Sequence, residues 1–240
     1  MTDSLSADAP VLLGSAAALA FLHTLVGIDH SLPFILLGRV RRWSLRRTLA
    51  VTGVCGLGHV ASSVLIGGIG IALGLALDRL TWVESARGEL AAALLIGFGL
   101  ASACGALWRY RFRGRTHSHL HAHADGTVHD HPHDHRGEHL HPHGIGRGLT
   151  PWALFVIFAF GPCESLIPLM VVPAVSRAWL VLAVLVLLFG LVTIGTMMLT
   201  VTAGYLGLRL DRLHVLEPHA EVVAGLVIAA SGAAVLWLGI

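Results

Sequence analysis

Two histidines and an aspartate stand in an otherwise apolar stretch near the N-terminus, in the order His23, Asp29, His30. Ionisable side chains inside a membrane-length apolar segment are costly and mark candidate functional sites. Imidazole and carboxylate together are a ligand set for divalent metals such as nickel, cobalt, zinc or iron. His23 and His30 lie seven residues apart, which in a regular helix is about 10 Å of rise. The two imidazoles can share one ion only if the segment unwinds; otherwise they are successive stations on a pathway.

Two residues that favour such unwinding flank the Asp-His pair. Gly27 precedes it and Pro33 follows it, and a proline inside a helix removes a backbone hydrogen bond. The carbonyl groups freed by a break can serve as additional ligands. We therefore predict a broken helix at this point of the chain.

A second apolar stretch contributes another histidine, His59, in the run Cys55-Gly-Leu-Gly-His-Val-Ala-Ser-Ser. The small residues around it allow close contact between helices. We interpret His59 as a further metal ligand. The alternative is a single hydrogen bond from His59 to a neighbouring helix.

The run Gly-Pro-Cys-Glu-Ser at 161–165 combines a predicted helix break with a carboxylate and a thiol. Glu164 is a candidate metal ligand, and Cys163 is an adjacent candidate whose thiolate would favour softer ions. A structural ion pair, or a polar lock between two halves of the chain, is the alternative interpretation of these membrane carboxylates.

Eleven histidines lie in the hydrophilic tract between the third and fourth apolar stretches. Such a tract cannot bury a core, so we expect it to be disordered without metal. Alternating imidazoles on a flexible chain can wrap a borderline metal with little selectivity. The tract is interpreted as a metal buffer or sensor, with a passive polar linker as the alternative. The candidate loop ligands are His117, His119, His121, His123, His129, His131, His133, His135, His139, His141 and His143.

The composition places these residues in a membrane protein. Of 240 residues, 55% are hydrophobic and only 12% are charged, with a mean hydropathy of +0.76, which is far from a water-soluble domain. The formal net charge of +2 is too small to suggest nucleic-acid binding. The three cysteines are far apart and form no CxxC pair, so neither a disulfide framework nor a zinc finger is predicted.

Six membrane-spanning helices are predicted from the apolar stretches, at 11–37, 49–77, 90–108, 151–172, 179–208 and 222–238. Thirteen of the sixteen arginines fall in the connections after the first, third and fifth spans. Arg79, Arg87 and Arg177 fall in the other connections. The positive-inside rule then places the odd-numbered connections in the cytoplasm and both chain ends outside a cell membrane, inner or plasma, that the chain crosses several times.

The two halves of the chain repeat weakly at an offset of 134 residues, at which Phe21, Gly27 and Ser31 recur as Phe155, Gly161 and Ser165. Each half has three spans, an odd number, so the second copy would be inverted in the membrane. The predicted fold is an all-α integral membrane protein of two inverted three-helix repeats, with broken helices at the midplane. Its parts are a first repeat at 1–108, the cytoplasmic His-rich loop at 109–150 and a second repeat at 151–240.

These features resemble the nickel/cobalt transporters of the NicO/UreH type, six-span metal permeases that are distantly similar to LysE-like exporters. The likeness covers most of the chain and rests on four features: His23 with Asp29-His30, the Leu-Gly-His run ending at His59, the Gly-Pro-Cys-Glu run at 161–164, and the His-rich loop. The family pattern usually has four residues between the first histidine and the Asp-His pair, whereas residues 24–28 make five here. The resemblance implies transport of nickel or cobalt by a secondary mechanism.

The expected function is therefore transport of a divalent metal ion across the lipid bilayer, with nickel or cobalt as cargo, zinc as a further candidate, and protons as a candidate coupling ion. No enzymatic activity, resident cofactor or nucleic-acid partner is expected, and the chain contains no lysine for a P-loop. Two alternatives stay open. One is a membrane thiol-disulfide shuttle using Cys163 and Cys55; the other is a metal sensor without transport.

Overall fold

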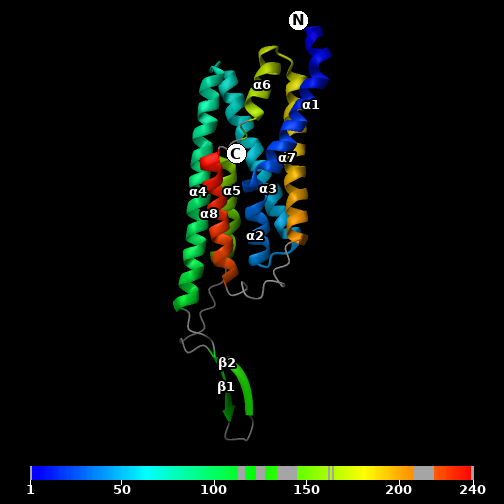
Figure 1. The fold of residues 1–240 in the computed structure, drawn as a ribbon. Coiled ribbons are helices and arrows are strands. Elements are labelled where there is room, and N and C mark those ends of the chain that lie inside the picture. Colours follow the sequence, from blue (N-terminus) through cyan, green and yellow to red (C-terminus); the bar gives the residue numbers. More distant parts are fainter. Residues whose placement is uncertain are drawn as a thin grey trace.

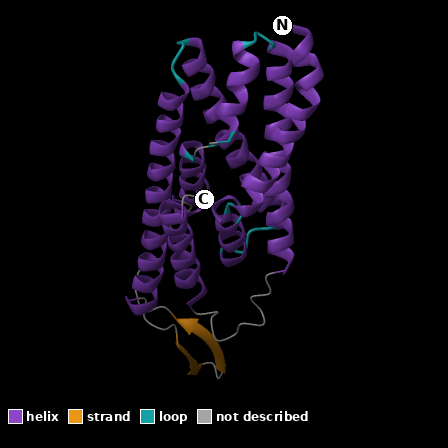
Figure 2. Cartoon of the chain, turned by 45° about the horizontal axis from the view of Figure 1, so that its top comes forward, coloured by secondary structure: helices purple, strands orange, loops and turns teal. Residues whose placement is uncertain are grey.

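The computed structural model describes residues 2–112, 117–122, 128–133, 145–161, 163, 165–207 and 219–238. The helices lie along one common axis in both views (Figures 1 and 2). In chain order the elements are α1 (Thr2–Val26), the short 3-10 helix η1 (Ile28–His30), α2 (Leu32–Val40), α3 (Leu45–Ala72), α4 (Leu77–Phe112), β1 (His117–Ala122), β2 (Val128–His133), α5 (Ile145–Phe160), α6 (Leu166–Val175), α7 (Trp179–Gly207) and α8 (Ala220–Leu238).

Five helices of the described chain are long and apolar enough to cross a membrane, at Ala9–Val26, Leu45–Ala72, Leu77–Arg111, Trp179–Gly207 and Ala220–Trp237. Their outward faces carry large apolar side chains, and on α7 Leu180, Leu187 and Leu191 are all more than half exposed. A water-soluble protein rarely leaves so much contiguous apolar surface uncovered. The fold is α-helical, and its exposed apolar faces indicate a membrane-embedded protein, as the composition predicts.

The fourth predicted span, 151–172, is not one long helix. It consists of two short apolar helices, Pro151–Phe160 and Leu166–Val175, with an interruption between them. The first predicted span, 11–37, is likewise interrupted, since α1 ends at Val26 and α2 begins at Leu32. Both interruptions coincide with the glycine and proline signals in the sequence.

The two interruptions occupy equivalent positions in the halves of the chain. The helix before each break ends at 26 and at 160, the helix after it begins at 32 and at 166, and the next long helix begins at 45 and at 179, an offset of 134 residues in all three cases. The two broken helices also run in opposite directions: in Figure 1, α1 lies above α2, whereas α5 lies below α6.

The first break has a simple backbone explanation. The amide of Gly27 still bonds to the carbonyl of His23 at 2.9 Å, which closes the last turn of α1. The amide of His30 then bonds to the carbonyl of Gly27 at 3.1 Å and forms the single 3-10 turn. Pro33 lies in the first turn of α2, where its missing N–H costs no helix hydrogen bond. The chain thus restarts as a helix at Leu32.

Helix α4 begins at Leu77, earlier than the predicted third span at 90. The prediction that Arg87 lies in a connection between spans is therefore wrong, because Arg87 is buried in the body of α4 together with Glu84. Charged residues lower mean hydropathy, so the hydropathy pattern places the start of the third span after Glu84 and Arg87. The structure tolerates the pair because its polar atoms have partners inside the bundle.

The histidine tract contains two short strands. β1 and β2 pair antiparallel, with His117 opposite His133, His119 opposite His131 and His121 opposite His129. Alternation with a period of two suits a strand, and backbone pairing needs no core. That the tract is disordered without metal stays a prediction. The other candidate loop ligands, His123, His135, His139, His141 and His143, lie outside the described residues.

Candidate metal centre

Three of the predicted ligands converge at the first helix break. His23 lies in the last turn of α1, His30 ends η1, and His59 lies in the middle of α3. The ring centroids are 4.8 Å apart for His23 and His30, 5.1 Å for His30 and His59, and 6.4 Å for His23 and His59. The unwinding between Val26 and Leu32 is what brings His23 and His30 together, so the two are members of one cluster and not successive stations.

The geometry of the cluster is close to that of a metal site. One nitrogen from each of the three histidines lies within 4.8 Å of the others, and among the described residues this is the group of potential ligands compact enough to hold an ion. Two imidazole nitrogens bound at about 2.1 Å to the same ion lie at most about 4.2 Å apart. The nitrogens are thus farther apart than around a bound ion, and the rings would have to turn toward one another to form a three-nitrogen site.

Four ring nitrogens of the cluster are buried without hydrogen-bond partners. His30 and His59 are each only 3% exposed, and no partner is found for Nε2 of His23, Nε2 of His30 or either ring nitrogen of His59. An unsatisfied buried polar atom costs about 1–3 kcal/mol and calls for an explanation. Neutral imidazole nitrogens are good ligands for borderline metals, so an ion would satisfy several of these atoms at once.

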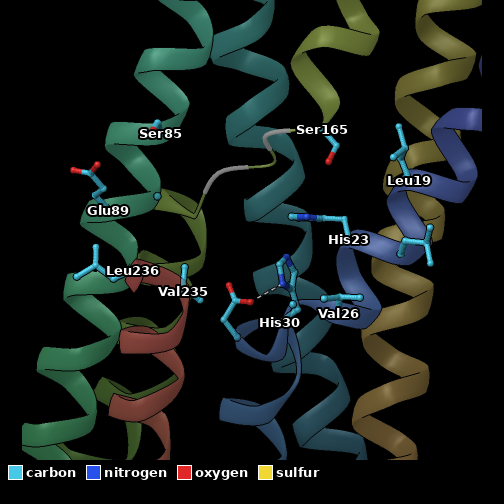
Figure 3. Close-up of a pocket in the computed structure, with 13 residues that line it drawn as sticks. Leu19, His23, Val26, His30, Ser85, Glu89, Ser165, Val235 and Leu236 are labelled. Carbon is cyan, nitrogen blue, oxygen red and sulfur yellow. Dashed lines mark hydrogen bonds and ion pairs between the residues drawn. The ribbon is translucent and has the colours of Figure 1, made fainter. Parts of the chain in front are cut away.

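Asp29 fixes the orientation of His30. Its Oδ1 lies 3.0 Å from Nδ1 of His30, so the proton on Nδ1 can be donated to the carboxylate and Nε2 is left as the ligand atom. Figure 3 shows this contact as a dashed line beside His30. A carboxylate in this position also raises the electron density of the imidazole and adds negative charge next to a bound cation.

A pocket of about 490 Å³ leads to the cluster. His23 and His30 lie on one side of it, and Ser85 and Glu89 of α4 lie on the other (Figure 3). A water molecule occupies about 30 Å³ of liquid, so the pocket has room for an ion with much of its hydration shell. A second, smaller pocket of about 30 Å³ is also lined by Asp29 and His30, and it borders His59.

The opposite side of the cluster is apolar. The ring of Phe158 lies 6.4 Å from that of His30 and 6.5 Å from that of His59, and it packs against Phe34 at 4.7 Å. Phe34 is fully buried. The cluster thus borders the large pocket at His23 and His30, and aromatic side chains pack beside His30 and His59.

The remaining predicted site residues lie apart from this cluster or outside the described chain. Glu164 is not among the described residues. Cys163 is fully buried, and its backbone amide bonds to Ser63 Oγ at 3.1 Å and to Glu84 Oε2 at 3.2 Å. All three cysteines are free, and Cys55 packs in a different core cluster from Cys163.

Glu84 and Arg87, which form a buried ion pair beside the second helix break, were not predicted as site residues from the sequence. Their spacing of three residues, on one face of a helix, is the signal that could have found them. This spacing becomes evident only when the third span is predicted to begin well before residue 90.

Gly27 is required at the first break because a side chain would collide with the site. A Cβ at this position would lie 2.4 Å from Nδ1 of His30 and 3.0 Å from Oδ1 of Asp29. We expect Gly27→Ala to weaken Co²⁺ binding by roughly 10- to 100-fold, the range found when the partners of metal ligands are disturbed. Titration of the purified protein with Co²⁺ measures this. Gly14→Ala on the same helix, where a Cβ meets nothing within 4 Å, is the control; equal weakening in both variants would contradict the explanation.

Comparison with protein-family models, with curated proteins and with solved structures finds no match to this chain.

Proposed function

We propose that this protein transports divalent transition-metal ions across a membrane, with Ni²⁺ or Co²⁺ as cargo. The observation that carries the proposal is the cluster of His23, His30 and His59, buried at a helix break within a bundle of membrane-length helices, with ring nitrogens that lack partners. Such intramembrane ionisable groups are expensive and are retained where ions pass. Imidazoles with an adjacent carboxylate suit nickel, cobalt and zinc.

The arrangement of the broken helices supports transport over simple binding. In the proposed topology, α5 and α6 count as one interrupted span, so the chain has six spans. These spans form two repeats of opposite orientation. Substrate sites in inverted-repeat transporters lie at interrupted helices where the two halves meet. Here Asp29 and His30 from the break in the first half line the same small pocket as Phe158 and Gly161 from the second half. We propose that Glu164, which follows the second break, is a further ligand on the route.

The proposed topology follows the arginines. The ends of α2 and α4 and the connections that carry Arg39, Arg109 and the histidine tract would face the cytoplasm, and the chain ends would lie outside. In this arrangement the eleven histidines act as a cytoplasmic metal buffer. The absence of lysine excludes a P-loop, so we propose a secondary mechanism. Protons are the proposed coupling ion, because metal and proton compete for the same imidazole nitrogen.

The test is metal flux into liposomes that contain the purified protein and a trapped indicator, with Ni²⁺, Co²⁺ and Zn²⁺ offered separately. We expect flux with the wild type and with a variant that lacks residues 114–146, and none with His30→Ala. Size-exclusion profiles of all three proteins show whether they remain folded. Metal flux that continues in His30→Ala would disprove the site, and absence of flux in every protein would disprove transport.

The same preparation separates the two alternatives. A metal sensor would bind Co²⁺ without moving it across the bilayer. A thiol-disulfide shuttle needs cysteines, so a variant with all three replaced by serine would lose activity, whereas the proposed transporter would keep its flux. The burial of Cys55 and Cys163 in separate core clusters favours the second result.

A further inference from the structure

Helix α4 carries a buried ion pair that touches none of the three clustered histidines. Glu84 is 1% exposed and Arg87 is 9% exposed, and the guanidinium of Arg87 donates to the carboxylate of Glu84 one helical turn away. Moving two charges out of water costs several kcal/mol per ion unless further hydrogen bonds satisfy them. The partners of the two side chains therefore indicate what the pair does.

Those partners are backbone groups of the second helix break. Nη2 of Arg87 donates to the carbonyl oxygens of Ala159 at 3.0 Å and Gly161 at 3.4 Å. Oε2 of Glu84 accepts from the amide of Cys163 at 3.2 Å. Carbonyls at the end of one helix and amides before the next have no partners within a helix. Arg87 thus satisfies the acceptors at the end of α5, and Glu84 satisfies a donor before α6.

The same pair is connected to His59 by two routes. Nη2 of Arg87 donates to Oγ of Ser62 at 2.8 Å, and that hydroxyl donates to the carbonyl of His59 at 2.9 Å. Gly161, held through its carbonyl by Arg87, lies against the histidine ring, because a Cβ on Gly161 would be 3.2 Å from Nδ1 of His59. The imidazole of His59 has no hydrogen bond of its own to orient it.

We propose that Glu84 and Arg87 are positioning residues for the metal site, which hold the break between α5 and α6 against α3 and so fix the place and orientation of His59. The inference rests on the proposed function in one respect, that the clustered histidines bind a transition-metal ion. It adds that a network on α4, outside the set of ligands, determines how well they do so. The order of the two charges matters, because the guanidinium of Arg87 donates to carbonyl groups and the carboxylate of Glu84 accepts from an amide.

The experiment measures Co²⁺ binding to the purified full-length protein in detergent, from the part of the visible absorption that His30→Ala abolishes, which separates the clustered histidines from those of the histidine tract. Three variants are compared with wild type: Glu84→Leu with Arg87→Leu, the reversed pair Glu84→Arg with Arg87→Glu, and Arg87→Lys. We expect each to bind Co²⁺ about 10- to 100-fold more weakly, with an altered absorption band. The control replaces both residues of another ion pair, Arg109 and Glu221, with leucine. Nη2 of Arg109 lies 2.5 Å from Oε2 of Glu221, and this pair joins α4 to α8. The control variant should bind Co²⁺ like wild type.

The outcomes are distinguishable. If wild type binds no Co²⁺, the proposed function fails. If wild type binds and the Leu-Leu and reversed pairs bind with the same affinity and spectrum, the positioning role is overturned and the pair is only a structural ion pair. If the three variants do not fold, Ser62→Ala decides, because it removes the hydroxyl between Arg87 and His59 and leaves the ion pair in place. Weaker binding then supports the inference, and unchanged binding overturns it.

Discussion

His59→Leu is expected to abolish metal transport while leaving the metal-free protein at least as stable as wild type. His59 is buried and neither ring nitrogen has a hydrogen-bond partner. Replacing it by an apolar side chain of similar size removes unsatisfied polar atoms that cost about 1–3 kcal/mol. It also removes one of the three clustered nitrogens that could hold an ion. We expect Co²⁺ affinity to fall on the order of 100-fold or more, which is about 2.7 kcal/mol.

Two measurements check this expectation. Thermal unfolding of the detergent-solubilised protein, with and without Ni²⁺, should show a metal-dependent rise in Tm for wild type and none for His59→Leu, whose Tm without metal should equal or exceed that of wild type. His219→Leu is the control, because His219 packs against Tyr110 at 4.7 Å and is not part of the cluster. A His59→Leu protein that is much less stable without metal, or that still responds to Ni²⁺, would show that His59 is a structural residue.

Gly99→Leu is expected to prevent α4 and α8 from packing and so to prevent the protein from folding into a single species. A Cβ at Gly99 would lie 2.4 Å from the amide nitrogen of Ala229 and 2.6 Å from the carbonyl oxygen of Gly225. These are backbone atoms of α8, so the clash is relieved only by moving the whole helix. Overpacking of a well-fitted core costs about 1–3 kcal/mol and occasionally more, and a backbone contact lies at the upper end of that range.

The control for this variant lies two residues away. A Cβ at Gly97 meets nothing within 4 Å, so Gly97→Leu adds the same side chain to the same helix without a clash. Size-exclusion chromatography and thermal unfolding should show aggregated or strongly destabilised protein for Gly99→Leu and a wild-type profile for Gly97→Leu. If both behave alike, close backbone packing of α4 on α8 is not what holds these helices together. Small residues at such contacts are typical of helices that associate in membranes.

The stability of the bundle and the chemistry of the candidate site thus depend on different residues. Glycines and other small residues bring the backbones of α4 and α8 together, whereas the histidines lie at a helix break where polar atoms are left without partners. Substitutions that damage packing should therefore reduce the amount of folded protein. Substitutions in the cluster should reduce metal binding in protein that is folded normally.

The sequence by itself determined the membrane-embedded α-helical class and the identity of the candidate ligands. Apolar length and composition are local properties, so four of the six predicted spans match single helices and the broken first span matches α1 with α2. The break at Gly27 and Pro33 was also predictable, because these residues change backbone conformation and hydrogen bonding wherever they stand. Asp29, His30 and His59 stood out because ionisable groups are rare in apolar segments.

Only the tertiary structure decided which of these residues meet and what holds them. Distances between α1, η1 and α3 depend on how the chain turns at the break. The proximity of His23, His30 and His59 could therefore not be predicted from spacing along one helix. The predicted boundary at residue 90 placed Arg87 outside the third span, since a hydropathy average counts charges without their partners. Those partners, the backbone groups at 159, 161 and 163, are more than seventy residues away along the chain. Burial of a charge is decided by such long-range contacts, which no local pattern contains.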